Sequence, residues 1–352
     1  MRSIVIHAPH DLRVEDAGFA AGEVTPGAVR IRMAAGGICG SDLHYFHNGG
    51  FGTVRIKEPM ALGHEASGIV EAVGSAVTGV RVGDLVAVNP SVPCDECSFC
   101  KAGMRNHCTD MRFNGSAMRF PHVQGMFREC MVVDADRALV MPKGVKAEEA
   151  ALCEPFAVSL HAVKQAGDLK GKTVLVSGCG PIGVLVIVAA KLAGAEQIVA
   201  TDITPHSLAM AERFGASTAI NVSAGAAALA PYAEGKGSVD AVFECSGNPH
   251  AIAGAISVLK PRGRMVLVGL GGDSPMPMNT IVAKELSICG TFRFDHEFAE
   301  AAALIGSRKV DLGPLISAVY PMDKAVEAFH HASDRTRATK VAIALAPTGS
   351  PT

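Results

Sequence analysis

At 352 residues the chain is longer than the size at which a single hydrophobic core usually stops growing, so we expect two domains. A hydrophobic fraction of 49% beside 19% charged residues excludes a disordered chain, and a formal net charge of −2 gives no electrostatic basis for binding nucleic acid or an anionic membrane. No signal peptide is apparent, and the most apolar stretch, 182–190, is well short of the roughly 20 residues of a membrane span, so we expect a cytoplasmic protein.

Short strands with Pro or Gly near their ends are predicted in the N-terminal part of the chain. They lie at 3–6, 12–15, 29–34, 68–74 and 84–88. Such regularly spaced strands are typical of a small β-barrel or a curled sheet. We expect Cys39, His64 and Glu65 at turns between these strands, where a rigid scaffold tends to hold reacting groups.

These three residues supply a thiolate, an imidazole and a carboxylate, which are ligand types that suit Zn²⁺. Three protein ligands instead of four leave one position for water or substrate, which distinguishes a catalytic zinc from a structural one. The alternative is a buried cysteine and an unrelated His–Glu pair, because short motifs often match by chance. The motifs that accompany the three residues decide between these interpretations.

A second cysteine cluster follows in the spacing C-x2-C-x2-C-x7-C. Its members are Cys94, Cys97, Cys100 and Cys108. Four thiolates can enclose one tetrahedral Zn²⁺ with no open position, so this spacing predicts a structural zinc site. Disulfides are disfavoured in a long chain without a secretion signal, and ferredoxin-type spacings differ from this one. A nucleic-acid-binding zinc module is a further alternative, disfavoured by the few basic residues within the loop.

From residue 173 the pattern changes to buried strands that alternate with helices. Strand 173–177 is continuous and β-branched, as buried parallel strands are. It runs into a G-x-G-x-x-G motif and then an apolar helix that ends near 192. The motif consists of Gly178, Cys179, Gly180, Pro181, Ile182 and Gly183. Its first two glycines allow a tight turn and close approach to a pyrophosphate, and the third lets the helix pack on the strand.

The next strand, 197–201, ends at Asp202, where a dinucleotide-binding Rossmann unit carries an acidic residue. A carboxylate there accepts hydrogen bonds from the ribose and repels a 2′-phosphate, so NAD is favoured over NADP. A protonated His206 would weaken that preference. Asp202 could instead cap the following helix, a role that is compatible with ribose binding.

Further strands are predicted at 218–221, 239–244 and 263–269, and 286–294 is expected to return the chain to the first domain. A helix at 297–305 and a strand at 340–345 would complete that domain. We therefore predict an α/β protein with a zinc-binding catalytic domain, 1–148 and 289–352, and an NAD-binding Rossmann domain, 149–288.

A thiolate–His–Glu site, a four-cysteine lobe and a Rossmann unit in this order resemble the zinc-containing medium-chain dehydrogenases over essentially the whole chain. Glu65 directly after His64, and Glu154 between Cys153 and Pro155, are similar to the polyol dehydrogenase branch. The resemblance is also carried by 38–45, 110–113, 115–118, 120–123 and 292–294. It implies a GroES-like β-barrel-type catalytic domain, a doubly wound parallel sheet in the Rossmann domain, two Zn²⁺ ions per chain, NAD with NADP possible, and a homotetramer.

The resemblance also implies roles for matching residues. Cys39, His64 and Glu65 would bind the catalytic zinc, with Glu154 a fourth ligand or the acceptor for the zinc-bound water. Asp42 would orient His64 by accepting its other ring N–H. Ser41 would take the alcohol proton and pass it through the cofactor ribose towards His44. Alternatively, Ser41 is a turn hydroxyl and His44 a solvated surface histidine.

The substrate implied is a small sugar acid or polyol, most specifically L-idonate oxidised to 5-keto-D-gluconate, with a sorbitol- or xylitol-type polyol as the alternative. Tyr45, Phe113 and Arg293 match positions that line the polyol pocket. A carboxylate substrate requires a cation, for which Arg112 and Arg293 are candidates and Arg119 a weaker third, although Arg293 could form an ordinary ion pair. A non-catalytic NAD- or zinc-binding protein and a zinc-independent quinone reductase are the other classes, and zinc content separates them.

Overall fold

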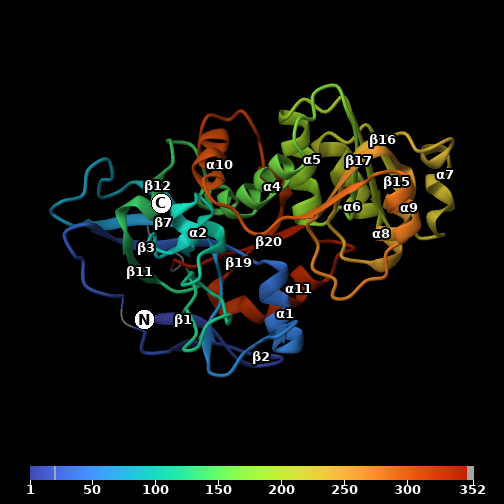
Figure 1. Cartoon of the computed structure of the whole chain (residues 1–352). Coiled ribbons are helices and arrows are strands. Elements are labelled where there is room, and N and C mark those ends of the chain that lie inside the picture. Colours follow the sequence, from blue (N-terminus) through green and yellow to red (C-terminus); the bar gives the residue numbers. More distant parts are fainter. Residues whose placement is uncertain (20, 347–352) are drawn as a thin grey trace. The chain divides into compact units, whose positions relative to one another are not determined.

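The computed structural model describes residues 1–19 and 21–346, and the chain forms two compact units (Figure 1). The first unit comprises Met1–Glu154, Phe298–Asp334 and the chain from Lys340. The second comprises Pro155–Glu297 and the short segment Arg335–Thr339. Within the described residues, no helix is both long enough and apolar enough to cross a bilayer.

The first unit is built mainly from antiparallel strands. Its strands are β1 (Arg2–Ala8), β2 (Asp11–Asp16), β3 (Ala28–Gly37), β4 (Gly50–Phe51), β5 (Val54–Arg55), β6 (Met60–Ala61), β7 (Glu65–Val73), β8 (Leu85–Val88), β9 (Ser91–Val92), β10 (Arg112–Phe113), β11 (Cys130–Asp134), β12 (Ala138–Val140), β19 (Ile316–Pro321) and β20 (Lys340–Ala344). Its helices are α1 (Gly40–Asn48), α2 (Ser98–Lys101), α3 (Ala147–Ala151), α10 (Glu297–Gly306), whose first residue belongs to the second unit, and α11 (Ala325–Ser333).

Its largest sheet has the order β12-β8-β7-β3-β20-β19, and β11 also pairs with β3. Strand β3 shows why this sheet encloses a core. Val29, Ile31 and Met33 are fully buried while the alternate side chains Arg30 and Arg32 are half-buried, which is the period of two that a strand imposes. The predicted strands of this region are therefore confirmed, and β3 and β7 lie side by side.

The predicted turns around Cys39 and Glu65 differ from the structure in two respects. Cys39 lies between secondary-structure elements, as predicted, but the element that follows it is helix α1 and not a strand. Asp42 in its first turn accepts a hydrogen bond from the Cys39 N–H (3.0 Å), and Gly49 ends the helix in the left-handed conformation (φ 66°). Similarly, Glu65 is the first residue of β7 and not part of a turn.

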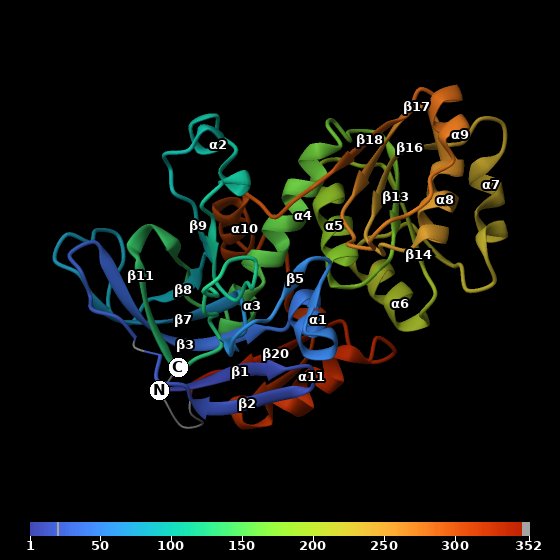
Figure 2. The same ribbon diagram turned by 60° about the horizontal axis from the view of Figure 1, so that its bottom comes forward.

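The second unit contains a six-stranded, fully parallel sheet (Figure 2), as predicted. Its strands are β13 (Thr173–Ser177), β14 (Gln197–Asp202), β15 (Thr218–Asn221), β16 (Val239–Glu244), β17 (Leu259–Leu267) and β18 (Ser287–Gly290). Its helices are α4 (Cys153–Gln165), whose first two residues belong to the first unit, α5 (Pro181–Leu192), α6 (Pro205–Phe214), α7 (Ala230–Ala233), α8 (Pro249–Val258) and α9 (Met278–Ala283). The order β15-β14-β13-β16-β17-β18 reverses between β13 and β16. Doubly wound sheets bind ligands at the carboxyl ends of their strands at such a reversal.

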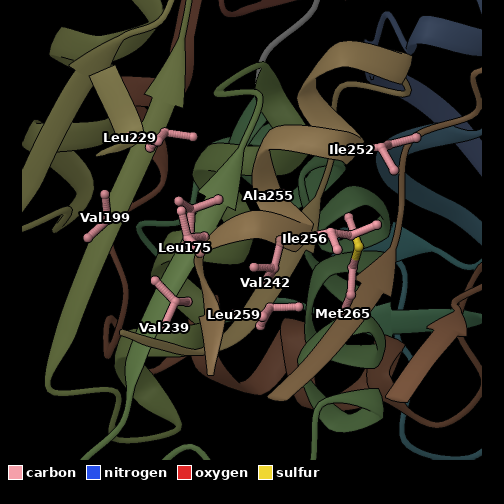
Figure 3. Packing of buried hydrophobic residues seen from close by; sticks show 11 residues of the cluster. Leu175, Val199, Leu229, Val239, Val242, Ile252, Ala255, Ile256, Leu259 and Met265 are labelled. Carbon is pink, nitrogen blue, oxygen red and sulfur yellow. The ribbon is translucent and has the colours of Figure 1, made fainter. Parts of the chain in front are cut away.

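Apolar side chains fix this sheet to helix α8 (Figure 3). Leu175, Val242 and Met265 come from β13, β16 and β17 and are completely buried. Ile252 and Ile256 of α8 pack in the same cluster with at most 5% of their surface exposed. Strand β13, which leads into the G-x-G-x-x-G turn, is therefore anchored in a close-packed core.

Candidate functional site

Cys39, His64 and Glu65 meet in the first unit, where their ligand atoms all lie within 4.8 Å of one another. Cys39 follows β3 and precedes α1, and His64 immediately precedes Glu65, the first residue of β7. Because β3 and β7 pair in antiparallel fashion, Gly37 lies opposite Glu65. The C-terminal end of β3 and the N-terminal end of β7 therefore lie side by side. His64 and Glu65 are buried and Cys39 is half-buried.

The electrostatics of this cluster favour a cation. Burial raises the pKa of the Cys39 thiol to about 12, and the Glu65 carboxylate contributes to the increase. Burial also raises the pKa of Glu154 to about 8, although His64 opposes that shift. A divalent ion would favour the ionised form of both groups, and the sulfur, nitrogen and oxygen donors suit zinc. The residues present therefore fit Zn²⁺.

Glu154 is 5% exposed and interacts electrostatically with His64, Glu65 and Cys39, but it is not among the three residues whose ligand atoms converge. It is the second residue of α4 and follows Cys153, which is fully buried. Its carboxyl group thus borders the cluster, and whether it binds the ion directly stays a prediction.

Asp42 connects the two segments that carry Cys39 and His64. Its carboxylate is completely buried and accepts the backbone N–H of Cys39 (3.0 Å) and of Gly63 (3.3 Å). The His64 Nδ1 lies 3.9 Å from Asp42 Oδ1, which is too long for the expected hydrogen bond. In this structure Asp42 therefore positions the backbone beside both ligands.

Lys340 is not among the site residues predicted from the sequence. It is 2% exposed and donates to both carboxylate oxygens of Glu65 at 2.7 Å. The two residues are 275 positions apart. The sequence signal is a charged residue at the start of the apolar strand predicted at 340–345. A lysine at a strand end is usually solvated, so this signal alone does not identify a buried partner.

Helix α1 carries the residues predicted to move the proton. Ser41 is half-buried and His44 is exposed, and residues three apart lie on the same face of a helix. Tyr45, on the same helix, is 2% exposed, and its hydroxyl accepts the backbone N–H of Ala117 at 3.0 Å.

Arg112 and Phe113 form strand β10, which pairs with β9. Arg112 is exposed, whereas Phe113 is buried with its ring centroid 5.7 Å from that of His64. Phe113 therefore packs against His64, a predicted metal ligand. Arg112 carries a guanidinium group on the same short strand.

The other two candidate cations differ in their surroundings. Arg119 forms an ion pair with Asp110 and also donates to the Asp110 carbonyl oxygen at 2.9 Å, so its charge has a partner nearby. Arg293 belongs to the second unit, where its guanidinium lies 4.9 Å from the centroid of the Phe292 ring. Its backbone has a left-handed φ of 53°, which is uncommon for a residue with a side chain.

The predicted four-cysteine site is also brought together, with all four sulfurs within 4.8 Å of one another. The members are Cys94, Cys97, Cys100 and Cys108. Sγ of Cys94 and Sγ of Cys108 are 3.4 Å apart, far beyond the roughly 2.05 Å of a disulfide. The N–H groups of Cys94 and Asp110 point at Sγ of Cys108 (3.2 and 3.3 Å), and backbone N–H donors lower the pKa of Cys97 to about 6. Donors directed at sulfur stabilise thiolates, so this lobe fits a four-coordinate structural zinc.

In the second unit, the glycines of the G-x-G-x-x-G motif are required for different reasons. Gly178 has φ 87°, and a Cβ on it would lie 2.8 Å from the Ser246 nitrogen. A Cβ on Gly183 would lie 1.9 Å from the Gly178 carbonyl oxygen, so it permits close packing of α5 on the turn. A Cβ on Gly180 would meet nothing within 4 Å, which leaves space for a ligand at the α5 N-terminus. Pro181 and Ile182 form the first two positions of this helix.

Asp202 lies at the end of β14 beside this turn. Its Oδ2 accepts the Cys179 N–H, and its Oδ1 accepts both the N–H and the hydroxyl of Thr204, all at 2.8 Å. Thr204, not Asp202, is the N-cap residue of α6. Each carboxylate oxygen can accept more than one hydrogen bond, so the group remains able to bind a ribose hydroxyl.

The chain matches two family models, the alcohol dehydrogenase GroES-like domain over residues 25–143 and the zinc-binding dehydrogenase over residues 181–307. L-Idonate 5-dehydrogenase (NAD(P)(+)) of Escherichia coli (strain K12) is 41% identical over 314 residues, 89% of this chain and 90% of that protein. Sorbitol dehydrogenase of Bacillus subtilis (strain 168) is 34% identical over 336 residues, 94% of this chain and 93% of its own. The crystal structure of the E. coli L-idonate 5-dehydrogenase matches with a TM-score of 0.92 and 38% identity, covering 97% of both chains.

Proposed function

The chain belongs to the zinc-containing medium-chain dehydrogenases, in their sorbitol dehydrogenase branch, and we propose that its substrate is L-idonate, which it oxidises to 5-keto-D-gluconate. At the coarser level it is a zinc-dependent NAD(P) dehydrogenase of polyols or sugar acids, with a GroES-like catalytic domain and a Rossmann domain. The observation that carries the chemistry is the convergence of Cys39, His64 and Glu65. The choice of L-idonate is supported by the 41% identity to the E. coli enzyme.

Cys39, His64 and Glu65 would hold the ion of the reaction site. Zinc bound there supplies a Lewis acid that favours loss of the proton from a secondary alcohol. Ser41, half-buried two residues after Cys39, would accept that proton while its own hydroxyl proton moves on towards His44. His44 is exposed on the same face of α1 and would return the proton to solvent. The alcohol would thus lose its proton through Ser41 and His44 and its hydride to the cofactor.

The nucleotide would occupy the turn between β13 and α5. The backbone at Gly178 and Gly180 and the N–H groups at the start of α5 would bind the pyrophosphate. Asp202 would accept a ribose hydroxyl and disfavour a 2′-phosphate, which supports NAD as the preferred cofactor with NADP as the second. The cofactor itself supplies the hydride chemistry.

A sugar acid differs from a polyol by a carboxylate, so recognition of L-idonate needs a cation. Arg112 is the stronger candidate in the first unit because Arg119 is paired with Asp110. Arg293 is the candidate in the second unit. A guanidinium group can hold a carboxylate through two parallel hydrogen bonds. Tyr45 and Phe113 would form an apolar wall for the substrate in the first unit.

A general polyol dehydrogenase is the second candidate, and it is supported by the similarity to sorbitol dehydrogenases over more than nine-tenths of the chain. The test is formation of NADH or NADPH, followed at 340 nm, with L-idonate, sorbitol and xylitol and with both cofactors. A higher kcat/KM for L-idonate than for either polyol supports the proposal. A higher value for sorbitol or xylitol assigns the enzyme to the second class.

We also propose that the enzyme is a cytoplasmic homotetramer. Light scattering during gel filtration tests the oligomer. A mass near that of one chain or a dimer would contradict it.

A further inference from the structure

Lys340 is a buried ammonium group with a complete set of acceptors. Its Nζ lies 2.7 Å from each carboxylate oxygen of Glu65 and 3.1 Å from the carbonyl oxygen of Ile38. An ammonium group has three N–H donors, so these contacts use all of them. Ile38 directly precedes Cys39, and its own N–H donates to the Val341 carbonyl at 2.9 Å. One lysine therefore constrains the Glu65 side chain and the backbone that leads into Cys39.

The contact is possible because of a glycine on the intervening strand. Strand β3 lies between β7 and β20, and Gly37 of β3 pairs with Glu65 on one side and with Ala342 on the other. A Cβ on Gly37 would lie 2.2 Å from Glu65 Oε2. The bare backbone thus leaves the space in which the Glu65 carboxylate crosses β3 to reach Lys340.

The charge balance explains why a cation is needed there. Glu65 and Asp42 are completely buried, Glu154 is 5% exposed, and the Cys39 sulfur adjoins them. An isolated carboxylate in such surroundings repels its neighbours and is poorly solvated. Lys340 Nζ lies at hydrogen-bond distance from both carboxylate oxygens of Glu65, so it balances the charge of that side chain and fixes its orientation.

We propose that Lys340 is a positioning residue of the reaction-site metal, which preorganises Glu65 and the Cys39 segment for zinc. This inference rests on the proposed function, because it concerns the ion that the three ligands would hold. Removal of Lys340 also removes a repulsive positive charge near the ion, which by itself would tighten zinc binding. In the proposal the loss of orientation outweighs that effect, since partners of metal ligands change metal affinity by about 10- to 100-fold.

The test compares zinc release from the two sites of the same chain. A colorimetric chelator in excess follows release from the holoenzyme of wild type, Lys340→Met, Lys340→Arg and Gly37→Ala. The four-cysteine site of the same chain is the internal control. The matched control variant is Lys260→Met, which removes a half-exposed lysine that pairs with Asp240 in the second unit. Each variant is first checked for native circular dichroism.

In Lys340→Met we expect release from the reaction site to accelerate about 10- to 100-fold while the four-cysteine site is unchanged. Lys340→Arg keeps a cation and should restore most of the wild-type rate. Gly37→Ala retains the lysine but displaces the carboxylate, and should resemble Lys340→Met. Lys260→Met should behave as wild type.

Unchanged or slower release from the reaction site of Lys340→Met would overturn the proposal, as would equal acceleration at both sites. If Lys340→Met does not fold, Gly37→Ala decides in the same way. A wild-type chain that carries zinc at the four-cysteine site alone would contradict the proposed function instead, so the two failures are distinguishable.

Discussion

Replacing Gly180 and Gly183 by alanine separates the binding role of the nucleotide turn from its packing role. A Cβ on Gly180 meets nothing within 4 Å, and its backbone (φ −65°, ψ −175°) is accessible to alanine. A Cβ on Gly183 would lie 1.9 Å from a backbone oxygen. We therefore expect Gly180→Ala to weaken nucleotide binding without loss of stability, and Gly183→Ala to destabilise the second unit.

The magnitudes follow from these contacts. Gly180→Ala places a methyl group where the pyrophosphate should approach the backbone, and a loss of about 1.4 kcal/mol or more would raise the Kd for NAD⁺ at least about tenfold. Its stability should change by about 0.5 kcal/mol or less, or increase slightly, since alanine restricts the unfolded chain. In Gly183→Ala a backbone segment must shift, at a cost of about 1–3 kcal/mol. For a chain of this size that cost corresponds to a lower Tm by several degrees.

Calorimetric titration of NAD⁺ measures the affinity, and thermal melting followed by circular dichroism measures stability, because the chain has no tryptophan for fluorescence. Wild type is the reference for both. If Gly180→Ala binds NAD⁺ as tightly as wild type, the assignment of this turn to the pyrophosphate is wrong. If Gly183→Ala melts at the wild-type temperature, the packing argument is wrong.

Further predictions concern the other parts of the site. Cys100→Ser should lose about one zinc ion per chain and have a lower Tm, because the three remaining thiolates do not complete the tetrahedral site. An unchanged zinc content by elemental analysis would contradict this prediction. Asp202→Asn keeps an acceptor but removes the charge that repels a 2′-phosphate. The kcat/KM for NADP⁺ divided by that for NAD⁺ should therefore rise about tenfold or more. An unchanged ratio would argue against a role of Asp202 in ribose binding. Arg112→Met should raise the KM for L-idonate by about 10- to 100-fold while the KM for sorbitol changes little; equal effects on both substrates would exclude Arg112 as the carboxylate ligand.

The central strands of the parallel sheet, β13, β14 and β16, were predictable because most of their residues are buried. Thr173–Ser177 and Val239–Glu244 have the predicted bounds, since apolar runs between turn residues define them. The edge strand Thr218–Asn221 also has the predicted bounds, although both of its ends are exposed. The start of β17 was missed by several residues. It begins at Leu259, and the segment that follows contains Pro261 and Gly263, which read locally as a turn although they belong to a strand in the sheet.

The four-cysteine cluster was predictable for a different reason, which is that cysteines at this spacing have few other uses. The cluster of Cys39, His64 and Glu65 was predictable only together with the motifs that accompany it. Helix α1 was not, because its glycine-rich start gives no helical period and its stability depends on the Asp42 carboxylate and on Gly49. Lys340 was not predictable because its contact with Glu65 requires β20 to pair beside β3. That pairing is tertiary, and a local pattern carries no information about it.

Zinc content measured together with turnover in Cys39→Ala tests the central claim most directly. Wild type should hold two zinc ions per chain and reduce NAD⁺ with its alcohol substrate. The variant should hold about one ion, in the four-cysteine site, bind NAD⁺ with wild-type affinity and show no turnover. Wild-type turnover in a variant that has lost the ion, or full activity of wild type with zinc confined to the four-cysteine site, would contradict the account.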